Sequence, residues 1–398
     1  MRTSVLAACV AVALTAGPLA APALAAPPSA SASASVRAAA GPDAEALCAA
    51  IAGLPDEDAT AALVRVGGTG GSWHGSSGVR DLVSGQAADP DARFRAGSTT
   101  KVVTAAVVLQ LAAERAVDLN RPVQHYLPGL LSKRFKPITV RQLLNHTSGI
   151  QPGDALGETL EEVYEHRFDT LPPRQVVASA VAKGPEFRPG KRQHYLNINY
   201  TVLGMLIEKV TGHSYATEAT RRVLHPAKMW DTYFPGTDPR IRGPHNRGYQ
   251  RMKQPDGTTR LVDVTEWNQA DRWAAGDMIS TTADLERLID TLFRGRIVPQ
   301  PQLREMFTVP RVKDTTMKDA TMSAGLQRFV YEGTVYWIKS GARYGYSTAI
   351  GATRGLSRTV VYSLNDTNAK DQDMNPVAER IVGAALKQGV SGRDHLCN

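Results

Sequence analysis

The stretch Phe94–Glu114, FRAGSTTKVVTAAVVLQLAAE, decides how this 398-residue chain is interpreted. Lys101 stands three positions after Ser98, and the twelve residues that follow it, 102–113, carry no charge. A run of this kind predicts a helix over residues 98–115 that is buried nearly all round. Ser98 and Lys101 then share one face of its first turn, and the lysine lies at the edge of a core.

This placement predicts nucleophilic chemistry at Ser98. Burial lowers the pKa of a lysine because the charged form is disfavoured. Lys101 can then accept the proton of Ser98 Oγ. The unpaired N–H groups of the first turn favour negative charge that develops there, and Gly97 permits close approach of another backbone. The S-x-x-K pattern occurs once in the chain.

A second pattern is YLN at 195–197, just before a predicted helix. A loop in this position can direct the phenol of Tyr195 and the amide of Asn197 into a cleft. The alternative is that Tyr195 is a packing residue and Asn197 is a helix cap.

A third pattern, KSG at 339–341, ends an extended stretch. Gly341 permits a substrate backbone to approach the strand, and Lys339 and Ser340 can meet a carboxylate. The alternative is a strand end with an exposed lysine.

Several chemistries lack a motif. The chain contains no G-x-S-x-G, H-E-x-x-H, paired C-x-x-C, G-x-x-x-x-G-K-[ST] or G-x-G-x-x-G. We therefore expect no metal, no cofactor and no nucleic-acid partner. The net charge is +8, with basic residues scattered along the chain. They form ordinary solvated faces or attract anionic cell-wall polymers.

The amino-terminal region predicts export. Residues 1–25 have the positive start, apolar stretch and small-residue cleavage site of a signal peptide. Residues 26–42 are rich in Ala, Ser and Pro and predict a flexible leader. No later apolar run reaches the roughly 18 residues that a membrane helix needs. We expect a secreted protein, extracellular or associated with the cell wall.

The predicted export bears on the state of the cysteines. Cys9 leaves with the signal peptide, so Cys48 and Cys397 remain. Exported chains oxidise cysteine pairs, which predicts a disulfide between them. Two free thiols are the alternative.

The order of elements predicts an α/β body interrupted by a helical insertion. The α/β subdomain comprises residues 43–116 and 275–390, the helical subdomain 117–274 and a carboxy-terminal tail 391–398. Strands are expected at 61–66, 72–80, 334–339, 346–352 and 358–364, and helices at 44–51, 98–115, 139–144, 200–210, 284–293 and 375–386.

The three patterns, in this order, resemble the penicillin-recognising serine hydrolases. The branch concerned contains class C β-lactamases, secreted D-alanyl-D-alanine carboxypeptidases, D-aminopeptidases and related esterases. Its pattern is S-x-x-K, Y-x-N and [KH]-[TS]-G, here STTK, YLN and KSG. ITVRQLLNHTSGI, WAAGDMISTTADL and GYSTAI also match, so the similarity covers about residues 44–390. It implies an α/β (α+β) fold, an antiparallel sheet flanked by helices with an inserted all-helical subdomain.

The resemblance also implies roles for the matching residues. Ser98 would be acylated and Lys101 would take its proton. Tyr195 would relay a proton to the leaving amine and later help to activate water. Asn197 would hydrogen-bond the substrate amide and Lys101, and Lys339 would supply positive charge near Tyr195 and bind a substrate carboxylate.

Backbone groups complete the implied site. The N–H groups of Ser98 and Ala342 would form an oxyanion hole, and Ser340 and Gly341 would contact substrate. His146, in the LLNHTSG phrase, is expected to be structural.

The sequence also departs from the family pattern. Leu196 stands where Ser or Ala is usual, and KSG stands where many carboxypeptidases of the branch have H-T-G. Gln327 follows Gly325-Leu326, where that subgroup has a carboxylate-binding arginine. These departures concern specificity more than acyl-transfer chemistry.

We expect a monomeric D-alanyl-D-alanine carboxypeptidase that penicillins acylate at Ser98, with a D-alanyl peptide or a β-lactam as its small-molecule partner. The alternatives are a class C-like β-lactamase, a D-amino-acid amidase or esterase, and a non-catalytic penicillin-binding protein.

Overall fold

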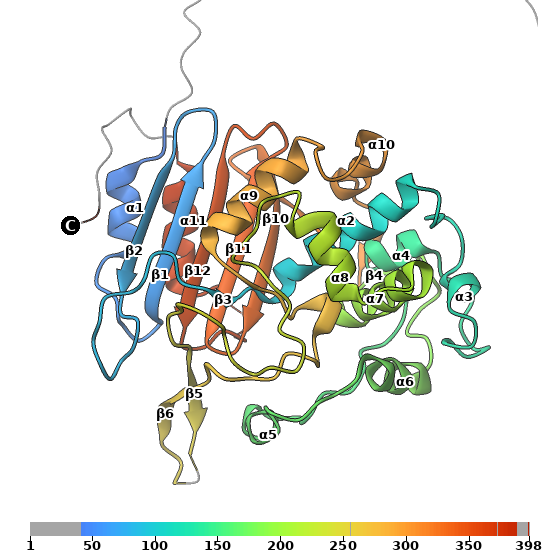
Figure 1. Ribbon diagram of the computed structural model, residues 1–398, viewed down its shortest axis with the longest axis horizontal. Coiled ribbons are helices and arrows are strands. Elements are labelled where there is room, and N and C mark those ends of the chain that lie inside the picture. The colour runs from blue at the N-terminus through green and yellow to red at the C-terminus, as the bar shows by residue number, and fades with distance from the viewer. Residues whose placement is uncertain (1–40, 255, 372, 388–396, 398) are drawn as a thin grey trace, which may run out of the picture. The chain divides into compact units, whose positions relative to one another are not determined.

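The centre of the fold is a six-stranded antiparallel sheet with the strand order β2-β1-β12-β11-β10-β9 (Figure 1). The computed structural model describes residues 41–254, 256–371, 373–387 and 397. β1 pairs with β12, so the early and late parts of the chain share one sheet. The strands are β1 Ala59–Gly67, β2 Trp73–Gly78, β9 Gln327–Tyr331, β10 Thr334–Arg343, β11 Tyr346–Thr353 and β12 Thr359–Asp366.

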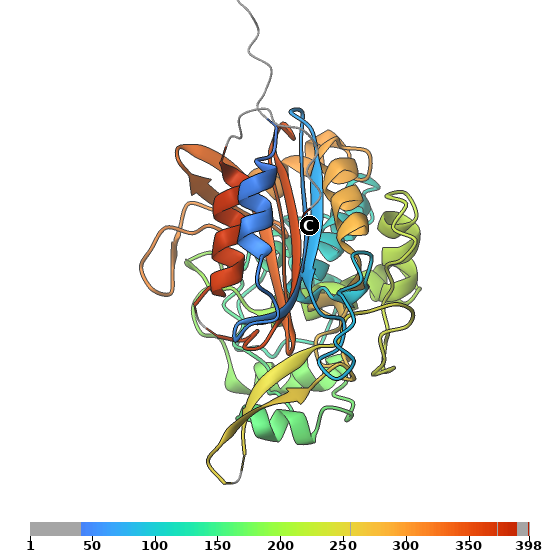
Figure 2. The same cartoon turned by 90° about the vertical axis from the view of Figure 1, so that its left-hand side faces the viewer.

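Helices cover both faces of this sheet, which is why β12 is buried along its whole length. α1 (Ala44–Ile51) and α11 (Pro376–Leu386) lie side by side on one face (Figure 2). α9 (Thr282–Phe293) packs on the other face through apolar side chains at helical spacing. These three helices match the sequence predictions closely.

The predicted helix over 98–115 forms as two pieces. A 3₁₀ turn, η1 (Gly97–Thr99), leads into the α-helix α2 (Thr100–Ala113). All its side chains from Thr100 to Leu109, and that of Leu111, are buried. The expectation of a helix buried nearly all round is therefore confirmed, and Ser98 lies in the tighter turn that precedes it.

The disulfide between Cys48 and Cys397 is present, with a Cα–Cα distance of 5.3 Å. It ties the tail to α1, whose apolar side chains form a core with α11 and the sheet. A loop of this length stabilises by at most about 5 kcal/mol on a chain-entropy account. The prediction of a disulfide is confirmed, and the alternative of free thiols is wrong.

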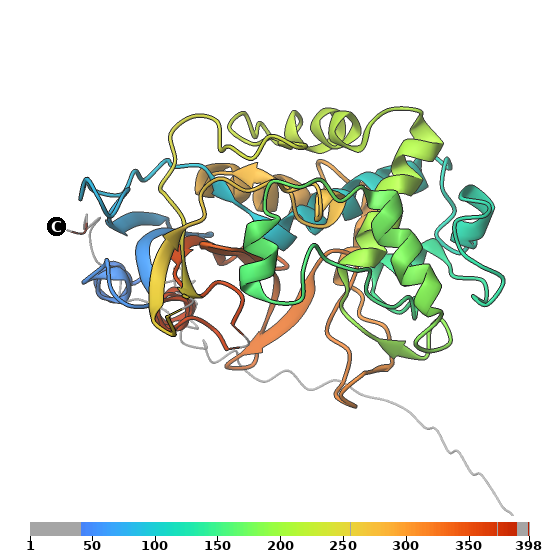
Figure 3. The ribbon, with the colours of Figure 1, turned by 90° about the horizontal axis from the view of Figure 1, so that it is seen from below.

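Helices are the commonest regular elements of the segment 117–274, but the segment is not all-helical as predicted. β5 (Tyr249–Lys253) and β6 (Thr259–Asp263) form an antiparallel hairpin within it (Figure 3). The Asp256-Gly257 pair, a typical hairpin-turn dipeptide, was the available sequence signal. Its helices are α3 Val123–Tyr126, α4 Val140–Leu144, α5 Leu160–Glu165, α6 Pro173–Lys183, α7 Asn197–Thr211 and α8 Tyr215–Ala219.

Short elements join these parts, and the mixed α/β fold class is confirmed. The predicted boundaries of the two subdomains stay predictions. The short elements are β3 Phe94–Arg95, β4 Arg192–Gln193, η2 Thr220–Leu224, η3 Trp273–Ala275, β7 Ile279–Ser280, α10 Gln300–Leu303, η4 Arg304–Phe307 and β8 Lys313–Asp314.

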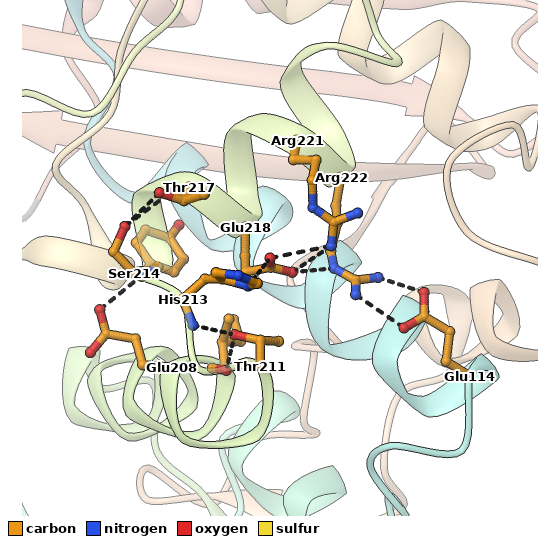
Figure 4. A network of polar contacts seen from close by, with 11 residues as sticks. Glu114, Glu208, Thr211, His213, Ser214, Thr217, Glu218, Arg221 and Arg222 are labelled. Carbon is orange, nitrogen blue, oxygen red and sulfur yellow. Dashed lines mark hydrogen bonds and ion pairs between the residues drawn. The ribbon is translucent and has the colours of Figure 1, made fainter.

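A polar network fixes the far end of α2 against α8 and η2 (Figure 4). Glu218 has no exposed side-chain surface, and its carboxylate meets His213, Arg221 and Arg222. Arg222 also pairs with Glu114, which follows α2 directly. The buried carboxylate thus joins the helix that carries Lys101 to the helical segment.

Some sequence predictions lie outside the described residues. These are the signal peptide at 1–25, the leader at 26–42 apart from its last two residues, and the tail at 391–398 apart from Cys397. Within the described part of the chain, no helix has the length and apolar character needed to cross a membrane.

Candidate active site

Ser98 lies on the turn η1, which packs against the strand β10. Gly97 has φ +52, and a Cβ added there would lie 2.6 Å from Ala342 N. A Cβ on Gly341 would lie 2.1 Å from Ala96 O and 2.9 Å from Ser98 N. Glycine at both positions therefore lets the serine turn and the strand approach each other directly.

Lys101 is fully buried, yet its ammonium has three acceptors. Nζ donates to Ser98 Oγ at 2.9 Å, to Asn197 Oδ1 at 2.7 Å and to Ala275 O at 2.7 Å. Three acceptors match the three N–H groups of a charged lysine. Burial lowers the pKa of Lys101 to about 8, and Tyr195 partly opposes the shift.

Tyr195 lies between two ammonium groups. Its ring centroid is 5.1 Å from Lys101 Nζ and 4.9 Å from Lys339 Nζ. Burial alone would raise the pKa of the phenol, but these two charges and the nearby Ser98 hydroxyl lower it to about 7. Among the described residues, the Tyr195 hydroxyl has no partner with good hydrogen-bond geometry, so it is free to face a reacting group.

Tyr195 and Lys101 titrate as a coupled pair because they are in contact. With pKa values of about 7 and about 8, the state between them is phenolate with ammonium. The site therefore places a phenol with a lowered pKa beside the Ser98 hydroxyl.

His146 supports the phenol from behind. Its ring lies 4.6 Å from the ring of Tyr195 and stacks on Tyr200 at 5.2 Å. Its Nδ1 accepts from Leu196 N, and its pKa is lowered well below the usual value, first by burial and then by the two lysines. His146 is thus a neutral positioning residue, the structural role expected from the sequence.

The strand β10 offers an open edge at the site. β9 pairs with it only as far as Ile338, so residues 339–343 have β11 on one side and the serine turn near the other. Lys339 is 3% exposed and donates to Ser340 O at 2.6 Å. The N–H groups of Ser98 and Ala342 lie at the contact of turn and strand, where an oxyanion would sit.

The structure thus brings Ser98, Lys101, Tyr195, Asn197 and Lys339 together, beside the backbone of residues 340–342. Sequence reasoning missed Ala275, whose carbonyl fixes Lys101. A backbone acceptor leaves no side-chain signal, although it lies in the WAAGD phrase.

Two other positions bear on the site's chemistry. Gln327, where the family resemblance would place an arginine, lies on β9 and donates to Thr321 Oγ1. In the described parts of the chain, no cluster of three or more His, Cys, Asp or Glu side chains could hold a metal ion.

A serine, a buried lysine, an acidic phenol and paired N–H groups together define an acyl-transferring serine hydrolase. The family model of Beta-lactamase matches residues 47–384. The chain belongs to the Beta-lactamase family.

Solved structures agree with this family. A D-stereospecific amidohydrolase from Streptomyces sp. is 31% identical with a TM-score of 0.75, over 87% of this chain and 99% of its own. The D-amino acid amidase from Ochrobactrum anthropi SV3 is 22% identical with a TM-score of 0.72, over 85% and 98%, and shows the fold alone.

Curated relatives match over less of their length. Protein flp of Staphylococcus aureus (strain MW2) is 31% identical over 216 residues, 53% of this chain and 41% of that protein. Teichoic acid D-alanine hydrolase of Staphylococcus aureus is 31% identical over 235 residues, which are 58% of this chain and 54% of that protein. The chain therefore spans about half the length of the curated relatives it matches.

Proposed function

We propose that this serine hydrolase forms an acyl-enzyme on Ser98 and acts as a D-alanyl-D-alanine carboxypeptidase that penicillins also acylate. One observation carries the proposal. Lys101 Nζ lies 2.9 Å from Ser98 Oγ, while the same ammonium and Lys339 flank the phenol of Tyr195. This arrangement supplies a nucleophile, a base and two fixed cations within one site.

The pKa shifts favour the phenolate as the base. Lys101 has three acceptors and a higher pKa than Tyr195, so it keeps its proton longer. Tyr195 O⁻ would take the proton of Ser98 Oγ as Oγ attacks the carbonyl carbon. Lys101, which the sequence suggested as the proton acceptor, would instead hold Ser98 and the phenolate in place.

The remaining steps use the same groups. Negative charge on the substrate oxygen would meet the N–H groups of Ser98 and Ala342, each worth roughly 3 kcal/mol of barrier. The C–N bond then breaks, and Tyr195 returns the proton to the leaving amine. In deacylation Tyr195 takes a proton from water, hydroxide attacks the ester, and Ser98 Oγ recovers a proton.

Two observations support a D-alanyl substrate. The names of two relatives, a D-stereospecific amidohydrolase and a teichoic acid D-alanine hydrolase, refer to D-stereospecificity or D-alanine. In addition, the Lys339 ammonium can meet the carboxylate of a leaving D-alanine, because it is next to the phenol that would protonate the leaving group. It would replace the arginine that is absent at Gln327.

The test has two measurements on the mature protein. Intact mass after incubation with a penicillin should show one adduct on the wild type and none on Ser98→Ala, while Ser84→Ala, on an exposed loop, keeps the adduct. D-alanine release from a D-Ala-D-Ala peptide should likewise be lost in Ser98→Ala and kept in Ser84→Ala. A Ser98→Ala variant that still releases D-alanine would refute the proposal.

A D-amino-acid amidase or esterase is the second candidate, because the Streptomyces amidohydrolase matches over nearly its whole length. Turnover of D-alanine amide with no D-alanine released from the dipeptide would favour it. Rapid lactam opening with a short-lived adduct would favour a β-lactamase. Binding without any turnover would favour a non-catalytic penicillin-binding protein.

We further propose that the protein is exported and acts at the cell wall as a monomer. The signal pattern at 1–25 and the Cys48–Cys397 disulfide support export. Fractionation of cells that express the chain with and without residues 1–25 tests it. Retention of both forms in the cytoplasm would contradict export.

A further inference from the structure

A second group of cations lies at the far end of the open edge from Tyr195. Arg343 is two residues past Gly341, so its side chain is on the strand face that carries Lys339. It is 2% exposed, and Nη2 donates to Asp271 Oδ1 at 3.3 Å. Within the described chain, its Nε and Nη1 have no hydrogen-bond partner.

Arg272 approaches the same carboxylate from the loop before η3. Its Nε lies 3.2 Å from Asp271 Oδ2, and its side chain is 26% exposed. A Cβ built on Gly276 would lie 3.2 Å from Arg272 Cβ and 3.6 Å from the carbonyl carbon of Gly97. Arg272 therefore starts beside the turn that carries Ser98 and reaches partly into solvent.

Lys370 adds a third cation from the loop after β12. Its side chain is exposed, its Nζ donates to Ala342 O at 3.0 Å, and it lies 5.8 Å from the centroid of the Tyr344 ring. Ala342, whose carbonyl accepts this hydrogen bond, is also the residue whose N–H faces the serine turn. Three separate segments of the chain thus direct positive charge to one end of the site.

Negative charge does not balance this group. Asp271 is the carboxylate that both arginines contact. Asp277 is also near Arg343, but its Oδ1 has no hydrogen-bond partner among the described residues, and burial raises its pKa well above the usual value. The two arginines therefore share one carboxylate, and burial of the Lys370 ammonium, followed by the charges of Arg272 and Arg343, lowers the pKa of Lys370 well below its usual value. Partly buried charges without partners are unfavourable, which makes an anionic ligand the natural counterpart.

We propose that Arg272, Arg343 and Lys370 form a subsite for an oxyanion, a carboxylate or a phosphate, carried by the acyl part of the substrate. The inference rests on the proposed function. If Tyr195 and Lys339 receive the leaving group, the acyl part runs along β10 towards Arg343. The subsite selects acylated substrates that carry a negative group and repels a free α-ammonium, as in D-alanine amide.

The experiment compares three D-alanyl-D-alanine substrates that differ only at the amino end: succinyl, acetyl and unsubstituted. Release of D-alanine gives kcat/KM for each. For the wild type we expect succinyl above acetyl and acetyl above the free amine. A phosphonoacetyl analogue, compared with the succinyl substrate, tells a phosphate-selective subsite from a carboxylate-selective one.

Arg272→Gln and Lys370→Gln are the test variants, because both side chains reach solvent and their removal should not prevent folding. Each should lower the succinyl-to-acetyl ratio of kcat/KM by about 10-fold, the loss of one hydrogen bond to a charged group. Lys253→Gln on the β5–β6 hairpin removes the same charge from an exposed position and should leave the ratio at its wild-type value. Arg343 is unsuitable because its loss would leave Asp271 with one partner fewer in the interior.

The outcomes separate this inference from the proposed function. If D-alanine is released but the wild type does not prefer the anionic substrates, or if the test variants leave the ratio unchanged, the subsite is refuted and the carboxypeptidase stands. If no substrate releases D-alanine, the proposed carboxypeptidase fails and this inference fails with it.

Discussion

Asn197 Oδ1 accepts a 2.7 Å hydrogen bond from Lys101 Nζ, although the two residues are 96 positions apart in the chain. Asn197 begins α7, and Lys101 lies in the first turn of α2. The contact joins the helical segment to the serine turn at the point where the chemistry would occur. Tyr195, two residues before Asn197, lies beside the same ammonium.

Tyr195→Phe should lower kcat by roughly 10²–10⁴-fold, because the phenol is the proposed proton carrier. Tyr200→Phe is the matched control. That phenol is also buried, but it donates to Leu144 O, and burial raises its pKa. We expect Tyr200→Phe to reduce stability while keeping the pH profile of turnover. Steady-state kinetics and thermal unfolding separate the two effects, and equal losses of kcat would contradict the role of Tyr195.

The wild-type rate should be bell-shaped in pH, with apparent pKa values near 7 and 8. Tyr195 must be phenolate, so activity rises as pH passes about 7. Lys101 must keep its proton, so activity falls as pH passes about 8. Both values belong to the coupled pair rather than to one residue. A profile of kcat/KM that stays flat between pH 6 and about 9 would argue against phenolate catalysis.

Lys339→Met should move the acidic limb of that profile to higher pH. The Lys339 ammonium is one of the two charges that lower the pKa of Tyr195, so its loss lets the phenol pKa rise towards its ordinary value. Lys339→Arg keeps the charge and should largely restore the limb. If the acidic limb of both variants stays at its wild-type pH, Lys339 acts only by binding substrate.

Gly97→Ala should abolish acylation at Ser98. The added Cβ would meet Ala342 N at 2.6 Å, and φ +52 costs an alanine about 1–2 kcal/mol. The serine turn would then move away from β10. Gly383→Ala, in the middle of α11 with open space around it, should instead stabilise by about 0.5–1 kcal/mol. Penicillin labelling and thermal unfolding measure the two outcomes, and normal labelling of Gly97→Ala would show that the contact is dispensable.

Glu218→Gln should destabilise the protein by about 3 kcal/mol at neutral pH, because it removes the buried carboxylate from Arg222, whose side chain is 10% exposed, and from Arg221. Burial opposes ionisation of Glu218, but Arg222 and Arg221 outweigh it and lower the pKa below 4.5. A depressed pKa means that the stabilisation is complete above pH 4.5 and is lost as pH falls further. The difference from wild type should therefore shrink in acid.

Glu114→Gln is the control for that measurement. Its carboxylate pairs with Arg222 but is about half exposed, so we expect a loss under about 1 kcal/mol. Denaturant unfolding at neutral and acidic pH gives both free energies. Equal losses for the two variants would show that burial of Glu218 does not matter.

Local patterns were sufficient for much of the fold. The uncharged run after Lys101 predicted a buried helix, and the extended stretches near the end predicted β10, β11 and β12. These predictions succeed because the spacing of side chains along a helix or a strand depends only on residues that are close in the chain. The hairpin of β5 and β6 was missed because its apolar pattern is short and one strand is largely exposed.

The sequence by itself determined that one serine and one lysine share a helical turn, since a spacing of three needs no tertiary information. It also determined the order of the three motifs, whereas the two remaining cysteines were predicted to pair with free thiols as the alternative, and the structure joined them. Only the tertiary structure decided that Lys101 and Lys339 flank Tyr195, that Ala275 O holds Lys101, and that Arg272, Arg343 and Lys370 converge. Burial and Coulombic contact set the pKa values of these groups, and both depend on distances between segments that are remote in the chain.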